Sequence, residues 1–337
     1  MSATTGFDLA ALTEHVNETK FGLDFYKYPL MENNTFTTTS RWGSILTGAK
    51  NDHYKLPTIA QTATLKDGSD CGFTPTDQTT FNQTDLYMQP VMVTGQFCVR
   101  ELEPFWLASG LPAGQHYQNG FNPLEANILN EVERALAKKM AVFPYYGPTG
   151  SDTVTYPYNW MAQLKAAYGI NVATTATTNG GSAGTDAQGA WNRVEALKNL
   201  FLANADTAAE VMDGGIVIFV SPLVASLYYE NLRTLYGQNT LVPVQAQMDA
   251  GNMSAWTHPG SGIKVVVVNA LGAGENEIIA QRVRNQVLAF DLQSDATRIE
   301  MGMDQYREYI WWKVRVKMGT AFRSLAATDI RYYGDAS

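Results

Sequence analysis

Charged and apolar residues alternate in one stretch near the end of the chain, residues 306–322, which reads YREYIWWKVRVKMGTAF. Alternation with a period of two is typical of a β-strand with one buried and one exposed face. The expected buried positions are Val314, Val316 and Met318. The expected exposed positions are the cations Lys313, Arg315 and Lys317, which we predict to meet either water or an acidic neighbouring subunit. The adjacent Trp311 and Trp312 are predicted to point to opposite faces, one toward the core and one toward a contact.

Two further extended segments, residues 53–65 and 85–99, flank a polar stretch rich in Gly, Asp and Thr. Apolar and β-branched residues with turn formers between them predict a long β-hairpin. A hairpin of this length is not stable alone in water, so it is expected to lie on a partner surface.

An amphipathic helix of about 20 residues, roughly 30 Å long, is predicted to follow Asn122. Asn122 is a good N-cap, Pro123 suits the first helical position, and Glu125 completes a capping box. The apolar stripe of this helix consists of Leu124, Ile128, Val132 and Leu136. Pro144 is predicted to end it.

The middle of the chain alternates helix and strand patterns. A helix is predicted over residues 191–203, and a buried strand over GGIVIFV. Ser221 and Pro222 then begin another helix, and a second buried strand, IKVVVVNA, starts at Ile263. This order predicts a mixed α and β sheet domain. Residues 1–48, in contrast, are polar and weakly periodic, so we expect them to stay mobile or to lie along something larger.

Composition narrows the function classes. The 337 residues are 45% hydrophobic, enough for a sizeable core and about two domains. A net charge of −8 argues against a protein that works by neutralising phosphates. The two cysteines, Cys71 and Cys98, are too few for a disulfide framework and favour a reducing compartment. No apolar run is long enough to span a bilayer, and the N-terminus lacks the features of a signal peptide.

The sequence contains no convincing motif for catalysis or metal binding. The four histidines lack metal-ligand spacing and are interpreted as surface or loop residues: His15, His53, His116 and His258. The sequence Gly180-Gly181-Ser182-Ala183-Gly184 fits a nucleophile-elbow pattern but lies in a Thr/Asn/Gly loop without a strand before it. Paired glutamates such as Glu131/Glu133 and Glu275/Glu277 are interpreted as solvated or as ion-pair partners across an interface. We predict no catalytic, cofactor-binding or metal-ligating residue, and no enzymatic activity.

The order of these elements resembles the major capsid proteins of tailed bacteriophages, which have the Hong Kong 97-type fold. The resemblance rests on the helix NPLEANILNEVERALAKKM, the hairpin, and the C-terminal MGMDQYREYIWWKVRVKMGTAFRSLAATDIRYYG. In that family a late strand alternates basic and apolar residues, and a Gly turn and a last short strand follow it. Residues 313–318, Gly319 and residues 329–334 match this pattern.

The resemblance implies an α+β fold in four parts. Residues 1–48 would form an N-terminal arm and residues 49–100 an extended hairpin loop over a neighbour. A peripheral domain would comprise residues 101–150 and 289–337, with a spine helix near 122–142. An axial α/β domain would comprise residues 151–288.

The implied function is that of a major capsid protein which self-assembles into pentamers and hexamers and forms the icosahedral head around phage double-stranded DNA. Its expected partners are itself, separate scaffolding, portal and decoration proteins, and DNA bound without sequence specificity. It would use no membrane and no cofactor, and would assemble in the host cytoplasm to become part of the virion. Candidate inter-subunit contacts are Trp42, Lys66, Asp67, Trp312, Lys313, Arg315 and Lys317.

The sequence departs from the pattern of this family in two respects. It starts almost directly at the arm, without a long fused scaffolding segment, and Lys66 at the hairpin tip is expected to be solvated and not covalently cross-linked. Two alternative functions stay open. The first is an encapsulin-type nanocompartment shell, which shares the fold. The second, from another class, is a monomeric α+β hydrolase or carbohydrate-binding protein with a Trp-rich surface; this hypothesis predicts a compact monomer with a concave pocket.

Overall fold

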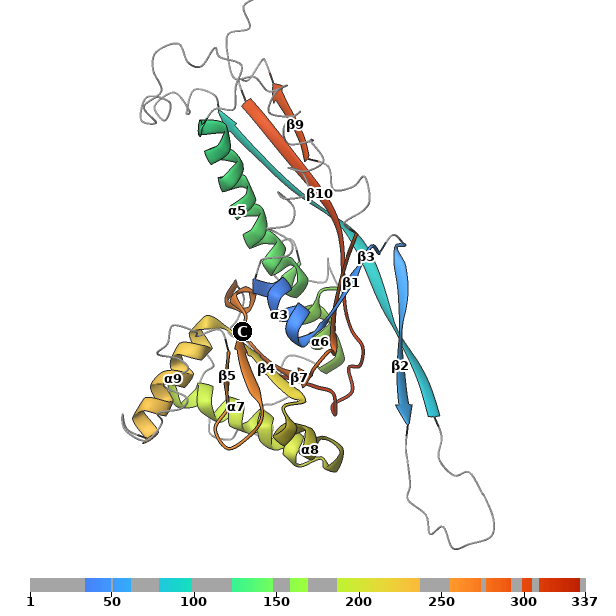
Figure 1. The fold of residues 1–337 in the computed structure, drawn as a ribbon, viewed down its shortest axis with the longest axis vertical. Helices are drawn as coiled ribbons and strands as arrows, with labels where there is room; N and C mark the ends of the chain where they lie inside the picture. Colours follow the sequence, from blue (N-terminus) through green and yellow to red (C-terminus); the bar gives the residue numbers. More distant parts are fainter. Residues whose placement is uncertain are drawn as a thin grey trace, which may run out of the picture.

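Two β-sheets and a long helix organise the computed structural model (Figure 1). The structure describes residues 34–49, 51–61, 79–98, 123–147, 158–168, 187–236, 255–273, 277–291, 299–304 and 309–333. The first sheet comprises β1 (Ser44–Thr47), β2 (His53–Gln61), β3 (Thr79–Cys98), β8 (Gln286–Asp291), β9 (Ile299–Asp304) and β10 (Tyr309–Phe322). The second comprises β4 (Ile216–Val220), β5 (Ala255–Thr257), β6 (Lys264–Val267), β7 (Ile278–Arg282) and β11 (Ile330–Tyr333).

Helices lie beside both sheets. They are α3 (Asn34–Trp42), α5 (Pro123–Tyr146), α6 (Trp160–Tyr168), α7 (Ala187–Leu202), α8 (Ala205–Asp213), α9 (Pro222–Tyr236) and the 3₁₀ helix η2 (Asn269–Ala273). The mixed α+β class expected from the sequence is confirmed.

Strand β10 is the centre of the first sheet. It pairs antiparallel with β3, β8 and β9 along different parts of its length. Val316 and Met318 are buried as predicted, while the side chain of Val314 lies outside the described part of the structure. Trp312 is buried and Trp311 is exposed, so the prediction that the two indoles point to opposite faces is confirmed.

Gly319 is not in a turn, contrary to the sequence interpretation. It lies inside β10, where it pairs with Met88 on one side and Ala289 on the other. A Cβ at this position would lie 2.6 Å from the backbone oxygen of Tyr87 and 2.8 Å from the sulfur of Met88. Glycine therefore allows three strands to approach closely at the middle of the sheet.

The predicted hairpin is confirmed for its described part. β2 and β3 pair antiparallel from His53 opposite Tyr87 to Gln61 opposite Thr79. Near its base, the buried side chains of Leu56, Leu86 and Met88 pack against Val287 and Ala289 of β8. Farther out the hairpin projects away from the rest of the molecule (Figure 1). The tip expected at residues 66–84 begins outside the described residues, and its last part, residues 79–84, is already strand.

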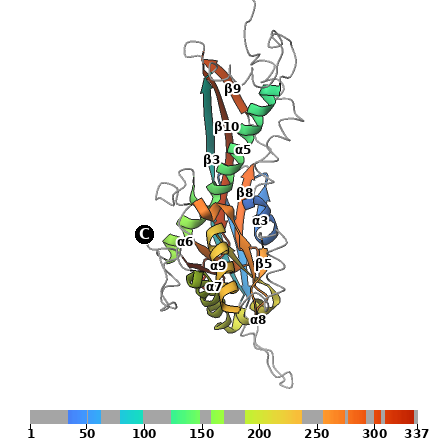
Figure 2. The same cartoon turned by 90° about the vertical axis from the view of Figure 1, so that its left-hand side faces the viewer.

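Helix α5 packs along the face of β3 and β10 that carries Trp312 (Figures 1 and 2). Leu136 is fully buried and Val132 is partly buried against this core, which confirms the predicted apolar stripe where its side chains are described, and Met140 is buried beside them. Pro144 does not end the helix, contrary to the prediction. It removes only one backbone donor in the last turn, and the chain leaves the helix at Gly147, with φ 73°.

The second sheet is covered on both faces. In β4, Ile216, Ile218 and Val220 contact the layer of α7 and α9, whereas Val217 and Phe219 contact the core shared with α5. Burial on both sides explains the unbroken apolar sequence of this strand. Both predicted strands and both predicted helices of this region are present.

The described part of the predicted arm, residues 34–48, packs against the rest of the molecule. α3 packs beside α5, and β1 pairs parallel with β8. The C-terminal strand β11 pairs with β7 in the second sheet, although the expected division grouped it with α5 and β10. One continuous core joins the two sheets, because it includes Leu136, Val316, Phe219 and Tyr332. The domain boundaries therefore stay a prediction.

Candidate interaction surface

The exposed side of the β3–β10 pair is the candidate functional surface. Residues opposite each other in an antiparallel pair share a face, and register pairs Met92 with Arg315, Thr94 with Lys313 and Gln96 with Trp311. We call these six residues the β3–β10 face. It is the opposite face of the pair from the one that contributes Val91, Trp312 and Val316 to the core with Leu136 of α5. The face carries two cations and two large exposed apolar side chains, Met92 at 56% and Trp311 at 39% exposure.

The three predicted cations differ in their surroundings. Arg315 is exposed, and Lys313 is half-buried. Lys317 makes an ion pair with Asp52, which precedes β2, so its charge is engaged within the chain. The sequence therefore predicted the alternation correctly, and Lys313 and Arg315 belong to the outer half of the strand.

The other predicted contact residues lie elsewhere. Trp312 is buried beneath the sheet, where it covers Gly95. Trp42 is half-buried against the main core, and Arg41 lies over its ring at 5.1 Å. Lys66 and Asp67 lie outside the described residues. The structure thus brings together Lys313 and Arg315, and places both tryptophans mainly within the chain.

One strongly exposed aromatic residue was missed by sequence reasoning. Phe81, near the outer end of the hairpin, has 71% of its surface exposed. The signal was available, since Phe81 is a lone aromatic in the polar run TTFNQT. Large exposed apolar side chains of this kind mark interaction sites when several lie near one another or meet a partner.

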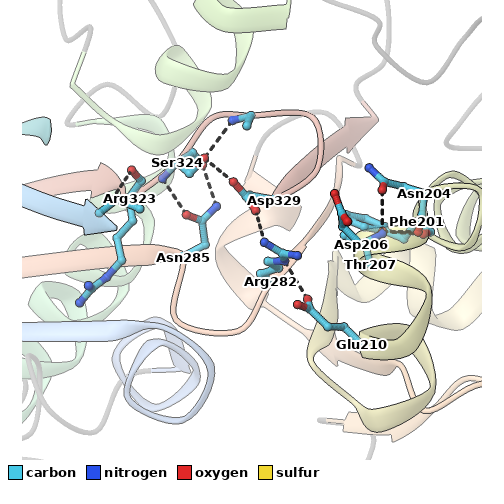
Figure 3. Close-up of polar contacts among 12 residues, drawn as sticks. Phe201, Asn204, Asp206, Thr207, Glu210, Arg282, Asn285, Arg323, Ser324 and Asp329 are labelled. Carbon is cyan, nitrogen blue, oxygen red and sulfur yellow. Dashed lines mark hydrogen bonds and ion pairs between the residues drawn. The ribbon is translucent and has the colours of Figure 1, made fainter. Parts of the chain in front are cut away.

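Two chain crossings connect the sheets, and they are tied together (Figure 3). Residues 283–285 lead from β7 to β8, and residues 323–329 lead from β10 to β11. Asn285 and Ser324 exchange two hydrogen bonds of 2.9 Å. The guanidinium of Arg282 donates to Asp329 at 2.6 Å and to Glu210 at 2.7 Å. Arg282 therefore joins β7, α8 and the second crossing.

The same junction holds the base of the hairpin. The hydroxyl groups of Thr58 and Thr84 donate to the backbone oxygen of Arg323, at 3.2 and 2.7 Å. His53 and Asp85 form an ion pair across the two strands, and Tyr87 stacks on the ring of His53. The hairpin is thus anchored at its base, while its outer part projects.

Glu277 is a buried carboxyl group within the chain, whereas the sequence interpretation was a solvated side chain or an ion-pair partner across an interface. It accepts hydrogen bonds from Tyr146 at 2.5 Å and Tyr332 at 2.6 Å, and Lys165 lies 3.4 Å away. Burial raises the pKa of Glu277, while these three partners act to lower it. The group links α5, α6 and β11, so its surroundings indicate a structural role.

His258 follows β5 in a loop as expected, but it is fully buried. Its Nδ1 lies 2.7 Å from the hydroxyl of Tyr228, and Nε2 lies 3.4 Å from Glu195. Trp191 packs against the imidazole at 5.0 Å between ring centroids. Burial lowers the pKa of His258 to about 4, despite Glu195. Because His258 and Tyr228 are both buried, neither side chain is accessible to a substrate.

Features of a reaction site are not found among the described residues. No group of three or more His, Cys, Asp or Glu side chains there is arranged to hold a metal ion. Within the same ranges, no helix has the length and apolar character needed to cross a membrane. A shallow hollow between β3, α5 and α6 is lined by Tyr87, Phe143, Tyr158 and Gly319 among others. Its lining holds no carboxylate, histidine or lysine.

Comparison with known proteins gives a likeness in structure. No family model matches the sequence, and no curated protein does. One similar structure is the satellite phage P4 procapsid including the size determination (Sid) protein. A chain of it superposes on this chain with a TM-score of 0.57 at 11% identity, and the likeness covers 94% of this chain and 91% of that one. Chains of Mycobacterium phage Ogopogo (TM-score 0.51, 13% identity, 88% and 93% covered) and of the capsid of Myoviridae phage XM1 (0.50, 12%, 89% and 92%) are also similar. The chain therefore has the fold of phage capsid proteins.

Proposed function

We propose that this protein is a major capsid protein of a tailed bacteriophage with a Hong Kong 97-type fold. Copies of it would form pentamers and hexamers, and these would build the icosahedral head that encloses double-stranded DNA. The observation that carries the proposal is the likeness to the P4 procapsid chain over 94% of this chain and 91% of that one. The likeness covers nearly the full length of both chains.

Physical features of the chain support self-assembly. The outer part of the hairpin has strand structure yet little support from its own chain, and it exposes Phe81. At the far end of the same sheet, Met92 and Trp311 are exposed on a face that no described helix covers. Both features would gain stability from contact with further copies, because two-stranded hairpins and exposed apolar faces are poorly stable in water.

The division proposed for the chain follows the expected fold. Residues 1–48 would act as the N-terminal arm, residues 49–100 as the extended loop, and α5 as the spine of a peripheral domain, with the second sheet in an axial domain. Partners would be the protein itself, scaffolding, portal and decoration proteins, and packaged DNA. We propose no enzymatic reaction for it. Its location would be the virion, after assembly in the host cytoplasm.

An encapsulin-type shell is the nearest alternative, because it would use the same fold and also self-assemble. Genes encoded beside this one separate the two: a terminase and a portal support a phage head, whereas a cargo enzyme without them supports a nanocompartment. The monomeric hydrolase or carbohydrate-binding protein has less support, because the described hollow is lined by no carboxylate, histidine or lysine and the described strands of the hairpin project from the body.

Electron microscopy of the full chain tests the proposal. The protein is expressed alone and together with its neighbouring genes, and fractions from size exclusion are imaged in negative stain. Rings, sheets or shells of uniform diameter are expected. Material that stays monomeric in every fraction and every co-expression would overturn the proposal and return attention to ligand binding.

A further inference from the structure

We propose that helix α3 is a strap that sets the angle between the two sheets, and that the chain crossing at Arg284 is the hinge about which the second sheet turns when the strap is released. This inference goes beyond the proposed function, because it concerns a movement within one copy and not a contact between copies. It rests on the contacts that α3 makes with both sheets and with α5.

The crossing from β7 to β8 has the geometry of a hinge. Residues 283–285 carry the chain from the second sheet into the first. Arg284, in the middle, has φ 70° and is the one described residue other than glycine with a positive φ. A non-glycine residue in the left-handed region is unfavourable and persists only where its surroundings hold it. Its N–H donates to the backbone oxygen of Trp42, the last residue of α3, at 2.6 Å. The strained crossing is therefore held by the end of α3.

The first residue of α3 holds the second sheet at the end farthest from this hinge. The first residue of β4 lies opposite Arg282, beside the hinge, whereas its last residue lies opposite Val267 of β6. The side chain of Asn34 binds at this far end. Its Oδ1 accepts a hydrogen bond from the N–H of Asn269 at 2.9 Å, and its Nδ2 donates to the backbone oxygen of Val267 at 3.5 Å. A contact at this distance from the hinge resists rotation because it acts on a long lever arm.

The next two residues of α3 hold α5 and the first sheet. The buried hydroxyl group of Thr35 donates to the backbone oxygen of Ala141 in α5 at 2.7 Å. The ring of Phe36 packs against Phe290, near the end of β8 that lies away from the crossing, with 5.6 Å between ring centroids. Residues 34–36 therefore join the second sheet, α5 and the first sheet in succession.

The length of α3 suits this role. The five residues of β4 span roughly 13 Å, at about 3.3 Å per step. The nine residues of α3 span about the same length, at 1.5 Å per residue. One helix therefore extends from the hinge to the far end of the second sheet. Figure 1 shows α3 at the lower end of α5, where the two sheets meet.

Other contacts between the sheets act differently from α3. The hydrogen bonds between Asn285 and Ser324 lie at the crossings themselves, next to the hinge. The shared core is apolar, and apolar contact has little directional preference. At the far end, Glu277 binds Tyr146 of α5 but makes no printed contact with β8. Release of α3 is therefore expected to widen the range of angles without separating the sheets.

Distances between spin labels test the strap in the full chain. The labels are attached through Ala135→Cys on α5 and Met212→Cys on α8, both at exposed positions. The two native cysteines are replaced by Cys71→Ser and Cys98→Ser. Labelled chain is diluted with unlabelled chain, so that each measured distance lies within one copy. The distance then reports the position of the second sheet and its helices relative to α5.

The strap is released by Asn34→Ala together with Thr35→Val. These changes remove the hydrogen bonds to the second sheet and to α5, and they are expected to broaden the distribution of label distances. Ser40→Ala is the matched control, because Ser40 is an exposed residue of the same helix whose hydroxyl group bonds only to the backbone of Thr37 among the described residues. Its distribution is expected to equal that of the unmodified chain.

Hydrogen exchange adds a second readout, measured by mass spectrometry. In the released variant, the peptide that contains Arg284 is expected to exchange about tenfold faster, the effect of losing one or two hydrogen bonds that hold the local structure. Amides of β4, at the centre of the second sheet, are expected to keep their protection. A change confined to the crossing distinguishes opening of the hinge from a general loss of stability.

The outcomes decide the proposal. A broadened distribution together with faster exchange confined to the crossing establishes the strap. An unchanged distribution in a folded variant, or equally faster exchange throughout β4, would overturn it. Circular dichroism checks folding, and if the double variant does not fold, Asn34→Asp takes its place. That side chain still accepts from Asn269 but cannot donate to Val267, so a smaller broadening is expected, and none would overturn the strap.

Electron microscopy of the released variant gives a consequence that rests on the proposed function. If the angle between the sheets sets the shape of each copy, particles of more than one diameter are expected, whereas the Ser40→Ala control keeps one diameter. The label distances do not require particles, so the two proposals fail separately. A chain that forms no assembly contradicts the proposed function only, and a uniform diameter despite broadened distances would show that the strap does not control curvature.

Discussion

The indole ring of Trp312 lies directly against Gly95 of the neighbouring strand. The two residues are opposite each other in the β3–β10 pair, and a Cβ at Gly95 would lie 2.4 Å from the indole ring. Because no side chain fits there, Trp312 can bend over β3 and pack into the core that includes Leu136 and Val316. This pair fixes how α5 and the long strands are joined.

Gly95→Ala is therefore expected to destabilise the protein by about 1–3 kcal/mol, as overpacking of a filled core does. The added methyl group forces Trp312 out of its position, which can be followed by the near-ultraviolet circular dichroism of the indole. Thr94→Ala, at the next and exposed position, is a matched control expected to change stability by about 0.5 kcal/mol or less. Equal unfolding temperatures for both variants would show that Gly95 is not required.

Arg282→Lys is expected to destabilise the junction between the sheets by about 1–3 kcal/mol. A single ammonium group cannot reproduce the forked contacts of the guanidinium with Glu210 and Asp329. Chemical denaturation measures the change. Arg134→Lys, in the exposed pair with Glu131 on α5, serves as a control with an expected loss of about 0–1 kcal/mol. A control loss as large as that of Arg282→Lys would argue against a special role for the junction.

The raised pKa of Glu277 gives stability a definite dependence on pH. The folded state holds its proton to higher pH than the unfolded state, whose carboxyl titrates near 4.5. The contribution of Glu277 to stability is therefore fully present below pH 4.5 and is lost as the pH rises through the folded-state pKa. Glu277→Gln, which stays neutral and keeps hydrogen-bonding atoms near Tyr146 and Tyr332, is expected to remove this loss.

Urea denaturation between pH 4 and 8 measures the effect as a difference between the two proteins. The free energy of unfolding of Glu277→Gln, relative to the unmodified chain, is expected to increase with pH in this range. Glu131→Gln, at an exposed position of α5, is expected to show no such trend. A flat difference for Glu277→Gln would mean that Lys165 and the tyrosines fully offset the effect of burial.

The contribution of His258 to stability depends on pH in the opposite direction from that of Glu277. Its pKa is about 4 in the folded state, against an ordinary value of 6.5, so the unfolded state binds the proton more readily. Stability is fully present above pH 6.5 and is lost as the pH falls toward 4. His258→Gln is expected to flatten this loss, and thermal unfolding at pH 7 and pH 5 measures it. The unmodified chain at the same two pH values is the control, and an equal loss of stability in both proteins would contradict the assignment to burial.

Periodicity was the reliable guide from sequence to fold. The alternation around Val316 and the continuous apolar run of β4 both report burial directly, and both were predicted correctly. The serine before α9 likewise acts through a neighbouring residue, because Ser221 Oγ accepts a hydrogen bond from the N–H of Val224 at 3.2 Å. Residue periodicity and capping patterns therefore predict the structure correctly where contacts between residues close in sequence determine it.

The incorrect predictions share a physical reason, because contacts between residues distant in sequence determine the structure at these positions. Pro144 and Gly319 were interpreted as breaks, but the packing of α5 and the close approach of three strands decide their conformation. Glu277 and His258 are polar residues whose burial depends on partners more than 30 positions away, or on aromatic packing around them. The candidate surface was half predicted: its cations follow from alternation, whereas Phe81 and Met92 become meaningful only when the structure shows them exposed at separate ends of one strand.

The mass of the purified full chain in solution tests self-assembly most directly. Size exclusion with multi-angle light scattering, at several concentrations and in the presence of co-expressed neighbouring proteins, measures it without labels. The account predicts species of at least five or six times 37.0 kDa, with larger shells in some conditions. A single species of 37.0 kDa at every concentration and with every partner would contradict it.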